Sequence, residues 1–438
     1  MKRLPEAWLP LTFIIPEFPM SRFPRRLFLQ TATSILGANS LSPLFGNAPQ
    51  ASPGFVETPG FKPHSLILTW FRDPTTTMVI QWVGTEAEAQ DRPIWFAPAD
   101  EMTWEQQVST HHRFPMTDLW IHRTELVGLK PGSQYRFRIG LDSEEYKFQT
   151  MPSKATDSFR FISGGDSGID IHAQQTNKLA AAQNPMFVFL GGDLAYENGK
   201  DPAVFLQFIK NYSDQLRDEE QRIIPLIACL GNHETQKGYH QPRDSAPFFF
   251  AFFDGLFNNG GHAVLDFGDY LSMVMLDSGH TTPVAGGQTD WLEQTLKQRE
   301  ELPSLFVAYH VPSYPSVRPY DLTDPDKSVG FDSRKYWVPL FERYNVDAVL
   351  EHHDHTFKRT IPLINSAYDK NGLVYLGDGS WGKIRKPKTT AERPYLAKAT
   401  ENYHLSLHSL EGEQRFHVAL SDTGKIVDLY TTRKRARI

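Results

Sequence analysis

Residues that could bind metal ions follow an apolar segment in the first half of the chain. The stretch Gly191-Gly192-Asp193-Leu194-Ala195-Tyr196 places a carboxylate and a phenol three residues apart, directly after residues 186–190. A carboxylate can bridge two cations, whereas a phenol must lose a proton of pKa about 10 before it binds well, which requires an ion of strong field. The pairing suggests a site that contains a trivalent ion, with iron(III) as the main candidate. Taken alone, the same residues could also form a glycine turn with a capping Asp.

Four further apolar segments end in residues of the same kind. Because open α/β sheets bind ligands outside the carboxyl ends of their strands, we expect these residues to lie at one edge of a sheet. Any one of them could be a turn residue, a core histidine or part of a solvated loop. Together they offer enough hard oxygen ligands and imidazoles for two metal shells. The segments are 159–163, 223–230, 305–309 and 346–350, and they lead into Asp166, Asn232 with His233, His310, and His353 with His355.

The order of these motifs resembles that of the calcineurin-like metallophosphoesterases and, within them, most closely the purple acid phosphatases. The motifs are GDxG, GDxxY, GNHE, a lone His after a strand, and HxH followed by an aromatic residue and Arg, and the resemblance covers roughly residues 156–438. It implies two metal ions, iron(III) and a divalent ion (Fe²⁺, Zn²⁺ or Mn²⁺), that share one carboxylate. The implied ligands are Asp166, Asp193, Tyr196 and His355 for iron(III), and Asn232, His310 and His353, with bridging Asp193, for the divalent ion.

The resemblance also implies a reaction. The protein would be an acid phosphatase that hydrolyses small phosphomonoesters by attack of a metal-bound hydroxide. Two metals about 3.5 to 4 Å apart can hold the attacking and leaving oxygens and lower the pKa of bound water. Asp193 and His233 are the catalytic candidates, and His233 would face the phosphate and donate a proton to the leaving group. His353 and His355 would reach the same side of an extended segment, whereas His352 would point away.

The sequence departs from the family pattern near the last motif and in the preceding loop. Glu351-His352 stands where a glycine usually precedes HxH, and Phe357 replaces a more usual tyrosine. The stretch from Tyr314 to Tyr320 lacks the histidine pair with which plant and animal relatives contact substrate. Tyr314 and Arg318 are the candidates for substrate contacts there, although Arg318 could equally be a surface-loop residue.

Two other functions are compatible with the motifs. A phosphodiesterase of the wider calcineurin-like group is the first alternative, but those enzymes usually carry Asp-x-His in the first motif, where this chain has Asp166-Ser167-Gly168, and they lack a ligand like Tyr196. A cell-surface binding protein with a vestigial metal domain is the second alternative. Vestigial sites normally lose ligands, whereas all seven expected positions are filled here.

Residues 55–152 are predicted to form a small all-β domain. The segment Leu129–Tyr135 resembles the turn and tyrosine of fibronectin type III domains, and purple acid phosphatases carry such a domain before the catalytic one. We expect a packing module rather than a carbohydrate-binding or adhesion domain. Short alternating runs separated by turn signals are typical of a β-sandwich, and they lie at 65–70, 78–83, 92–96, 120–126 and 134–139.

Residues 156–438 are predicted to form an α/β domain, because strands alternate with helical stretches. The resemblance implies a layered α/β/β/α sandwich. The aromatic segment 248–253 is expected in the core or at a domain contact, and residues 403–408 and 414–420 are expected to pair as strands that close a second sheet. Their histidines are expected to be polar sheet residues rather than ligands. The predicted helices are 172–183, 203–215 and 288–298.

Composition excludes several classes of protein. The chain has 438 residues, 40% of them hydrophobic, and a net charge of −6. The chain lacks the excess of basic residues that would indicate a nucleic-acid partner. No apolar run is long enough to form a transmembrane segment. The single cysteine, Cys229, excludes a disulfide within the chain and is expected to be buried.

Residues 1–53 are predicted to be an export signal followed by a flexible tract. Arg25 and Arg26 precede a mildly apolar stretch, which resembles a twin-arginine signal; a general secretory signal is the alternative, and Met20 is a candidate initiator. A protein that folds around two metals gains from loading them before it crosses the membrane. We expect a bacterial protein that is periplasmic or secreted, cleaved between about Gly46 and Phe55.

Overall fold

The structure, a computed structural model, describes residues 53–56, 59–90, 92–155 and 159–434. The predicted export segment, with Arg25 and Arg26, lies outside these residues except for Pro53. Within the described ranges no helix has the length and apolar character needed to cross a membrane.

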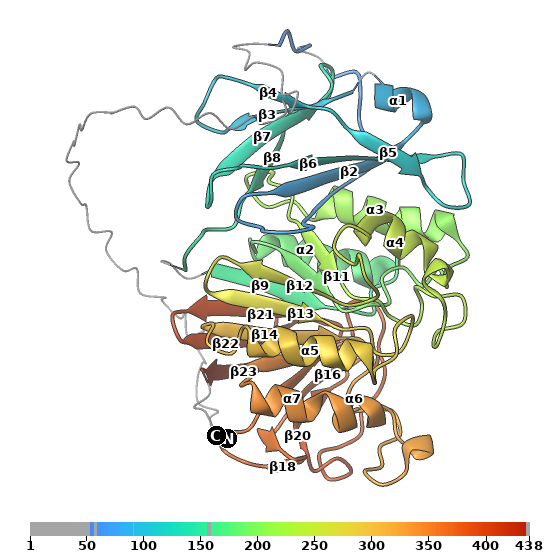
Figure 1. The fold of residues 1–438 in the computed structure, drawn as a ribbon, viewed down its shortest axis with the longest axis vertical. Helices are drawn as coiled ribbons and strands as arrows, with labels where there is room; N and C mark the ends of the chain where they lie inside the picture. The colour runs from blue at the N-terminus through green and yellow to red at the C-terminus, as the bar shows by residue number, and fades with distance from the viewer. Residues whose placement is uncertain (1–52, 57–58, 91, 156–158, 435–438) are drawn as a thin grey trace, which may run out of the picture. The chain divides into compact units, whose positions relative to one another are not determined.

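The first part of the described chain is a β-sandwich of two four-stranded antiparallel sheets (Figure 1). All five predicted runs form strands. The hydroxyl of Tyr135 accepts a hydrogen bond of 2.8 Å from the backbone N–H of Lys130, so the predicted tyrosine does fasten the turn before its strand. One sheet has the order β1 (Ser65–Thr69), β2 (Met78–Gly84), β6 (Trp120–Leu126), β5 (Thr110–Arg113), and the other β4 (Glu105–Gln107), β3 (Ile94–Pro98), β7 (Gln134–Ile139), β8 (Tyr146–Gln149), with α1 (Glu86–Gln90) between β2 and β3.

The second part contains a six-stranded and a seven-stranded sheet (Figure 1). Three parallel strands begin the six-stranded sheet, and β13, β14, β15 and β19 run parallel in the other. The six-stranded order is β11 (Leu226–Ala228), β10 (Val188–Leu190), β9 (Phe159–Gly164), β21 (His404–Glu411), β22 (Gln414–Ser421), β23 (Ile426–Arg433). The seven-stranded order is β12 (Ala263–Phe267), β13 (Leu271–Met275), β14 (Ser304–Tyr309), β15 (Ala348–Glu351), β19 (Tyr375–Asp378), β16 (Phe357–Thr360), β20 (Leu396–Thr400).

Alternate residues of the seven-stranded sheet belong to two different hydrophobic cores. Phe306 and Ala308 of β14 pack in the core shared with the six-stranded sheet, whereas Val307 packs with Leu292 and Phe341 from helices on the outer face. Since side chains along a strand alternate between faces, the two sheets lie face to face with helices outside, as the α/β/β/α expectation requires.

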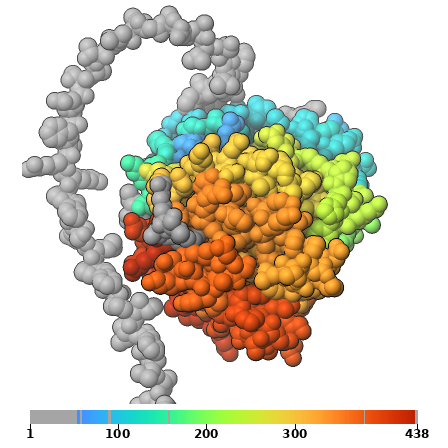
Figure 2. All heavy atoms as spheres, turned by 60° about the horizontal axis from the view of Figure 1, so that its bottom comes forward, coloured from blue at the N-terminus to red at the C-terminus, as the bar shows by residue number. Residues whose placement is uncertain are grey.

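The predicted helices form at the predicted places. They are α2 (Ile171–Ala182) and α3 (Pro202–Gln215) beside the six-stranded sheet and α5 (Gly287–Lys297) on the seven-stranded one, joined there by α6 (Phe331–Tyr336) and α7 (Val338–Arg343). In Figure 2 the orange residues of the α6 and α7 region cover part of the face that comes forward.

The aromatic segment forms α4 (Pro247–Phe253), and all its phenylalanines are buried. Phe248 packs against Phe114 of the β-sandwich with ring centroids 5.5 Å apart, and Gln81 of β2 donates a hydrogen bond of 3.1 Å to the Phe252 carbonyl. The segment therefore belongs to the contact between the sandwich and the α/β region, as expected.

The C-terminal strands differ in part from the prediction. β21 and β22 do pair, but β21 lies antiparallel to β9, with His408 opposite Phe161. The tail therefore extends the sheet that carries β9, β10 and β11 instead of completing the other one. His408 lies 2.7 Å from Ser163 Oγ and 2.8 Å from His417 Nδ1, so these histidines take part in a buried polar network within the sheet.

Candidate metal centre

The predicted ligands all follow the carboxyl ends of strands. Asp166 follows β9, Asp193 and Tyr196 follow β10, Asn232 follows β11, His310 follows β14, and His353 and His355 follow β15. Because β9, β10 and β11 run parallel in one sheet and β14 and β15 run parallel in the other, the carboxyl ends of these strands bring the loops to one edge, as expected.

Backbone strain is concentrated in the same loops. Five of the predicted ligands have a positive φ that L-residues rarely adopt, namely Asp166 at 57°, Asp193 at 52°, Tyr196 at 67°, His353 at 71° and His355 at 58°. Such conformations cost on the order of 1 to 3 kcal/mol each and persist where the surroundings dictate them. These backbone conformations direct the five side chains toward one another.

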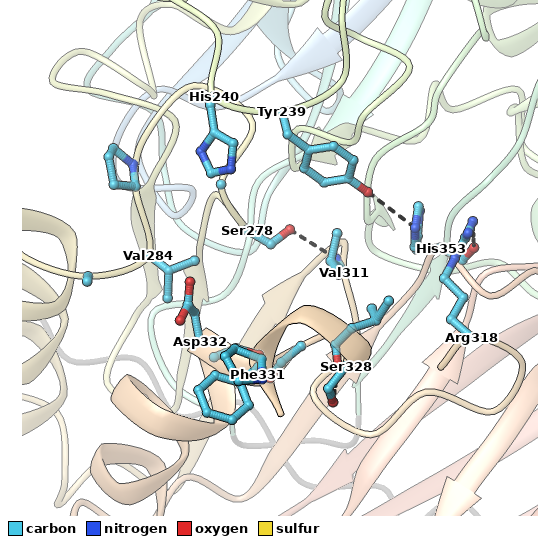
Figure 3. Close-up of a pocket in the computed structure, with 17 residues that line it drawn as sticks. Tyr239, His240, Ser278, Val284, Val311, Arg318, Ser328, Phe331, Asp332 and His353 are labelled. Atoms are coloured by element: carbon cyan, nitrogen blue, oxygen red, sulfur yellow. Dashed lines mark hydrogen bonds between the residues drawn. The ribbon is translucent and has the colours of Figure 1, made fainter. Parts of the chain in front are cut away.

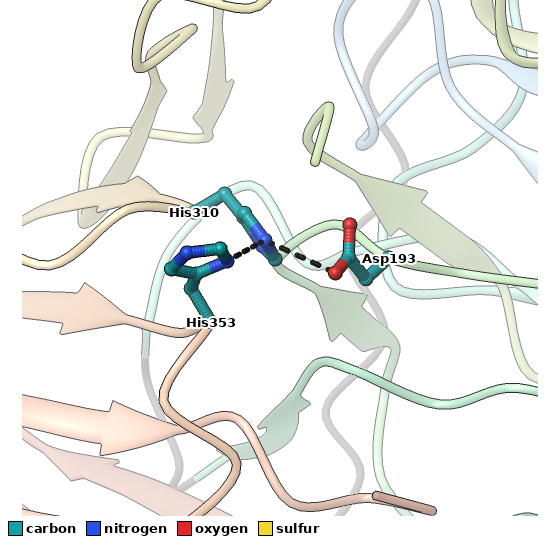
Figure 4. Close-up of side chains that lie close together, drawn as sticks. All are labelled: Asp193, His310 and His353. Carbon is teal, nitrogen blue, oxygen red and sulfur yellow. Dashed lines mark hydrogen bonds and ion pairs between the residues drawn. The ribbon is translucent and has the colours of Figure 1, made fainter. Parts of the chain in front are cut away.

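One donor set consists of Asp193, His310 and His353, whose ligand atoms all lie within 4.8 Å of one another (Figure 4). His310 Nε2 lies 3.3 Å from Asp193 Oδ2 and 3.0 Å from His353 Nδ1. Asn232 Oδ1 lies 3.1 Å from the same His310 nitrogen. Four side chains predicted to hold the divalent ion therefore converge.

A second donor set consists of Asp166, Asp193 and His355, again within 4.8 Å. His355 Nε2 lies 3.0 Å from Asp166 Oδ1 and 3.1 Å from the Tyr196 hydroxyl. Asp193 belongs to both sets, which is the position predicted for a bridging carboxylate.

The chemistry of these donors fits metal ions. Asp193 Oδ2 is buried, and no described residue donates a hydrogen bond to it. Burial of an acceptor without a hydrogen bond costs free energy unless a cation binds it. His310 Nδ1 lies 2.8 Å from the Gly191 carbonyl; donation of that N–H leaves Nε2 with a free lone pair toward Asp193. Burial and the charge of Asp166 raise the pKa of Tyr196 well above its ordinary value, so only a strong cation would convert this phenol to a ligand.

Glu234, the last residue of the GNHE motif, holds the two neighbouring loops together. Its buried carboxylate accepts backbone hydrogen bonds from Gly231 at 2.6 Å, Asp193 at 2.8 Å and Leu194 at 2.7 Å. Burial raises the pKa of Glu234 to about 7. In the sequence, only the place of Glu234 in the GNHE motif indicates a role for this residue.

His352 points away from the donor sets, as predicted. Its Nδ1 lies 2.9 Å from the Tyr309 carbonyl, and its ring fills the space beside the loops after β9 and β10. A Cβ on Gly191 would meet this ring at 2.0 Å, and one on Gly165 at 2.7 Å. Gly165 of the first motif and Gly191, which precedes the second motif, therefore leave room for the His352 ring.

Glu351, the other departure from the family pattern, forms a buried ion pair with Lys358 at 2.8 Å. Glu351 Oε1 also accepts hydrogen bonds from the Tyr309 hydroxyl at 2.6 Å and from the Ser313 N–H at 2.7 Å. These contacts connect the loop after β14, which carries His310, to the end of β15 and to β16.

His233 lies at the open side of the donor sets, with its side chain 34% exposed. Its Nδ1 lies 2.6 Å from Asn198 Oδ1, and its Nε2 lies 3.9 Å from Asp193 Oδ2. Its backbone N–H donates a hydrogen bond of 2.8 Å to Asp193 Oδ1. The imidazole is therefore held beside the bridging carboxylate and can meet a molecule from solvent.

The two predicted substrate contacts behave differently. Arg318 lines a cavity of about 490 Å³ that also includes His353, and its guanidinium lies 3.5 Å from Asp354 and donates 3.3 Å to the His353 carbonyl. Tyr314 is completely buried in the hydrophobic core, where its hydroxyl lies 2.9 Å from Ser366 Oγ. Aromatic packing against Tyr375 and Tyr395 holds it there, so the structure does not bring Tyr314 to the site.

Tyr239 is a residue of the site that sequence reasoning missed. Its hydroxyl lies 3.3 Å from His353 Nε2 (Figure 3). Its ring packs against His280, with the ring centroids 5.0 Å apart. No motif in the sequence marks it, because it lies in an irregular loop several residues after GNHE.

Comparisons with known proteins find matches for both parts of the chain. Residues 63–150 match the family described as Purple acid Phosphatase, N-terminal domain, and residues 166–357 match Calcineurin-like phosphoesterase. The chain is 28% identical to human Acid phosphatase type 7 over 427 residues, which cover 87% of this chain and 91% of the human protein. It is 26% identical to Purple acid phosphatase 21 of Arabidopsis thaliana, over 61% of each chain.

Among solved structures, a purple acid phosphatase from yellow lupin (Lupinus luteus) seeds aligns with a TM-score of 0.68 at 16% identity, over 84% of this chain and 73% of that one. The fold and the matched families together define the class. The chain belongs to the calcineurin-like metallophosphoesterases and is an enzyme that hydrolyses phosphoesters at a binuclear metal centre. Within that class it is a purple acid phosphatase-like member with the family's N-terminal β-domain.

Proposed function

We propose that the protein is an acid phosphatase specific for phosphomonoesters, with iron(III) held by Asp166, Asp193, Tyr196 and His355. The divalent ion, Fe²⁺, Zn²⁺ or Mn²⁺, would be held by Asn232, His310 and His353 and share Asp193. The observation that carries the proposal is the convergence of two buried donor sets on Asp193, each within 4.8 Å. Buried carboxylates and imidazoles in this number are otherwise costly.

When bound, two metal ions would supply an activated water and neutralise the charge of the phosphate. The side chains do the rest. His233, held through Nδ1 by Asn198, presents Nε2 on the open side and would donate a proton to the leaving-group oxygen. Arg318, on the cavity wall, would bind a phosphate oxygen through its planar donors.

Tyr196 supports iron(III) in one position. Its hydroxyl lies 3.1 Å from His355 Nε2 and 3.4 Å from Asp166 Oδ1, so a cation bound by those two groups would also meet the phenol oxygen. A buried phenol is a poor ligand for Zn²⁺ or Mn²⁺, because deprotonation requires the field of a trivalent ion.

The proposal is tested with protein purified with its own metals. We expect one iron and one further metal per chain, and hydrolysis of an aryl phosphate faster than that of a bis-aryl phosphate. Asn232→Ala should reduce turnover by at least roughly 100-fold. Mutation of a residue that only hydrogen-bonds to a metal ligand typically costs about 10- to 100-fold, and loss of a direct ligand should cost more. Faster diester turnover would favour the phosphodiesterase alternative, and full metal occupancy without any turnover would contradict the enzyme assignment.

We also propose that the chain is exported by the twin-arginine route to the periplasm or the exterior, with residues 55–152 as the β-domain and 156–438 as the catalytic domain. The motif around Arg25 and Arg26 supports this. N-terminal sequencing of the exported protein should begin between about Gly46 and Phe55. An exported form that keeps Met1 would contradict cleavage, and export of an Arg25→Lys, Arg26→Lys variant would contradict the route.

A further inference from the structure

We propose that the cavity beside the metal centre binds the leaving group of the substrate and selects monoesters of apolar, uncharged alcohols that carry a single phosphate. This inference rests on the proposed phosphatase function and specifies its substrate class.

The cavity begins at the metal centre. His353, a proposed ligand, and Tyr239, whose hydroxyl lies 3.3 Å from His353 Nε2, line one end of it. Figure 3 shows Arg318 beside these two residues, with Val284 and Asp332 at the opposite end. Because His353 lies at this end, the ester group of a phosphate held at the metals can reach the cavity. Its volume of about 490 Å³ lies within the range of sites for organic ligands, about 300 to 1,000 Å³.

Part of the cavity wall is apolar, although Ser278 and Ser328 also line it. Val311, Val329 and Phe331 come from the loop after β14 and the start of α6, and Val284 comes from the segment before α5. None of these side chains can hydrogen-bond, so sugar hydroxyls or further phosphates placed against them would lose hydration without compensation. An alkyl or aryl group would gain by burial.

The charge of the lining argues against substrates with several phosphates. Among the described residues that line the cavity, Arg318 is the only Lys or Arg and Asp332 the only carboxylate. Arg318 already lies 3.5 Å from Asp354 Oδ1 and donates to the His353 carbonyl. One partly compensated cation can assist one phosphate, whereas a carboxylate at the far end repels a second.

The loop that forms this wall is held in place by buried contacts. Arg334, 9% exposed, donates hydrogen bonds to the Ser313 carbonyl and, at 2.8 Å, to the Val329 carbonyl. Gly330 has a φ of 70°, and a Cβ there would meet the Pro312 carbonyl oxygen at 2.0 Å. The wall is therefore preformed. Little free energy is spent on ordering the wall when a leaving group binds, so burial of the leaving group contributes to affinity.

The experiment compares 2-phenylethyl phosphate with ethyl phosphate, because their alcohols have similar acidity and differ in apolar area. We expect kcat/KM for the phenylethyl ester to be roughly 10- to 100-fold higher, the range for burying one phenyl group. The non-hydrolysable 2-phenylethylphosphonate and ethylphosphonate, measured by calorimetry on the metal-loaded protein, should differ in Kd by a similar factor. Tripolyphosphate should be hydrolysed more slowly than either ester.

Val284→Asp should lower the ratio between phenylethyl and ethyl compounds by roughly tenfold, because the new carboxylate must be desolvated by the phenyl group. Val127→Asp is the matched control, since Val127 is 58% exposed on the β-sandwich, and it should keep the wild-type ratio.

Equal Kd values for the two phosphonates, or a ratio that Val284→Asp leaves unchanged, would overturn the inference, as would preferential turnover of tripolyphosphate. If the two phosphonates bind with different Kd values but neither ester is hydrolysed, the binding pocket is supported and the phosphatase assignment fails. The binding measurement on the wild-type protein decides the inference even if Val284→Asp does not fold.

Discussion

The Tyr196 hydroxyl and His355 Nε2 lie 3.1 Å apart, although 159 residues separate them in the chain. Tyr196 follows a strand of one sheet and His355 follows a strand of the other. Their contact therefore exists only because two sheets pack with their carboxyl ends together, and it marks the position proposed for iron(III).

Tyr196→Phe should remove the visible charge-transfer band expected of an iron(III)–phenolate pair and lower iron content, since the phenol oxygen is lost while the ring remains. The measurement is an absorption spectrum with metal analysis of the purified protein. Tyr239→Phe is the control, because Tyr239 lies near His353 and not in the iron set; it should keep the band. A coloured Tyr196→Phe protein would disprove the assignment of this ligand.

Removal of the metals should destabilise the folded protein. Asp193 is shared by both donor sets and its Oδ2 receives no hydrogen bond, so cations that bind the native state should stabilise it. At a metal concentration about 100 times Kd the gain per site is about 2.7 kcal/mol. Thermal unfolding with and without chelator measures it, and Asn232→Ala should show a smaller difference than the wild type. An equal melting temperature with and without chelator would contradict the prediction.

Lys358→Met should destabilise the protein by roughly 3 to 5 kcal/mol, because it leaves the Glu351 carboxylate buried without its cation. Adding Glu351→Gln to the same chain should recover part of that loss. Denaturant unfolding measures both. Arg343→Met, which breaks an exposed pair with Glu293 in which Arg343 is 61% exposed, should cost at most about 1 kcal/mol. Equal effects of Lys358→Met and Arg343→Met would show that burial of the pair is unimportant.

Acid should destabilise the β-sandwich through His122. This residue is completely buried, with its ring 5.1 Å from that of Trp82, and burial lowers its pKa from 6.5 to about 4. Between these values the unfolded chain binds the proton more readily, so His122 lowers stability as the pH falls from 6.5 to about 4. The full shift corresponds to about 3 kcal/mol.

The test compares wild type and His122→Phe, both treated with chelator, by denaturant unfolding at pH 7 and at about pH 4.5. The wild type should lose more stability between the two pH values than the variant does. If both lose the same amount, protonation of His122 plays no part in the acid response.

Local sequence patterns were sufficient to predict many of the strands and helices and the loops that carry the candidate ligands. Alternating apolar runs predicted the sandwich strands, and apolar runs that end in Asp, Asn or His predicted the loops that carry Asp166, Asp193, Asn232, His310 and His353. These features depend on neighbouring residues, because strand periodicity and turn chemistry act over a few positions.

Other features were decided only by tertiary structure. Tyr314 and Arg318 lie four residues apart in the same predicted loop, yet Tyr314 is buried against Tyr375 whereas Arg318 lines the cavity. In the sequence Glu351 is only a departure from a motif, whereas the structure shows its contacts with Lys358 and Tyr309. The sequence by itself therefore determined which residues could bind metal, while packing of the two sheets determined which of them meet and what surrounds them. The physical reason is that burial and long-range hydrogen bonds depend on elements far apart in the chain, which no local pattern specifies.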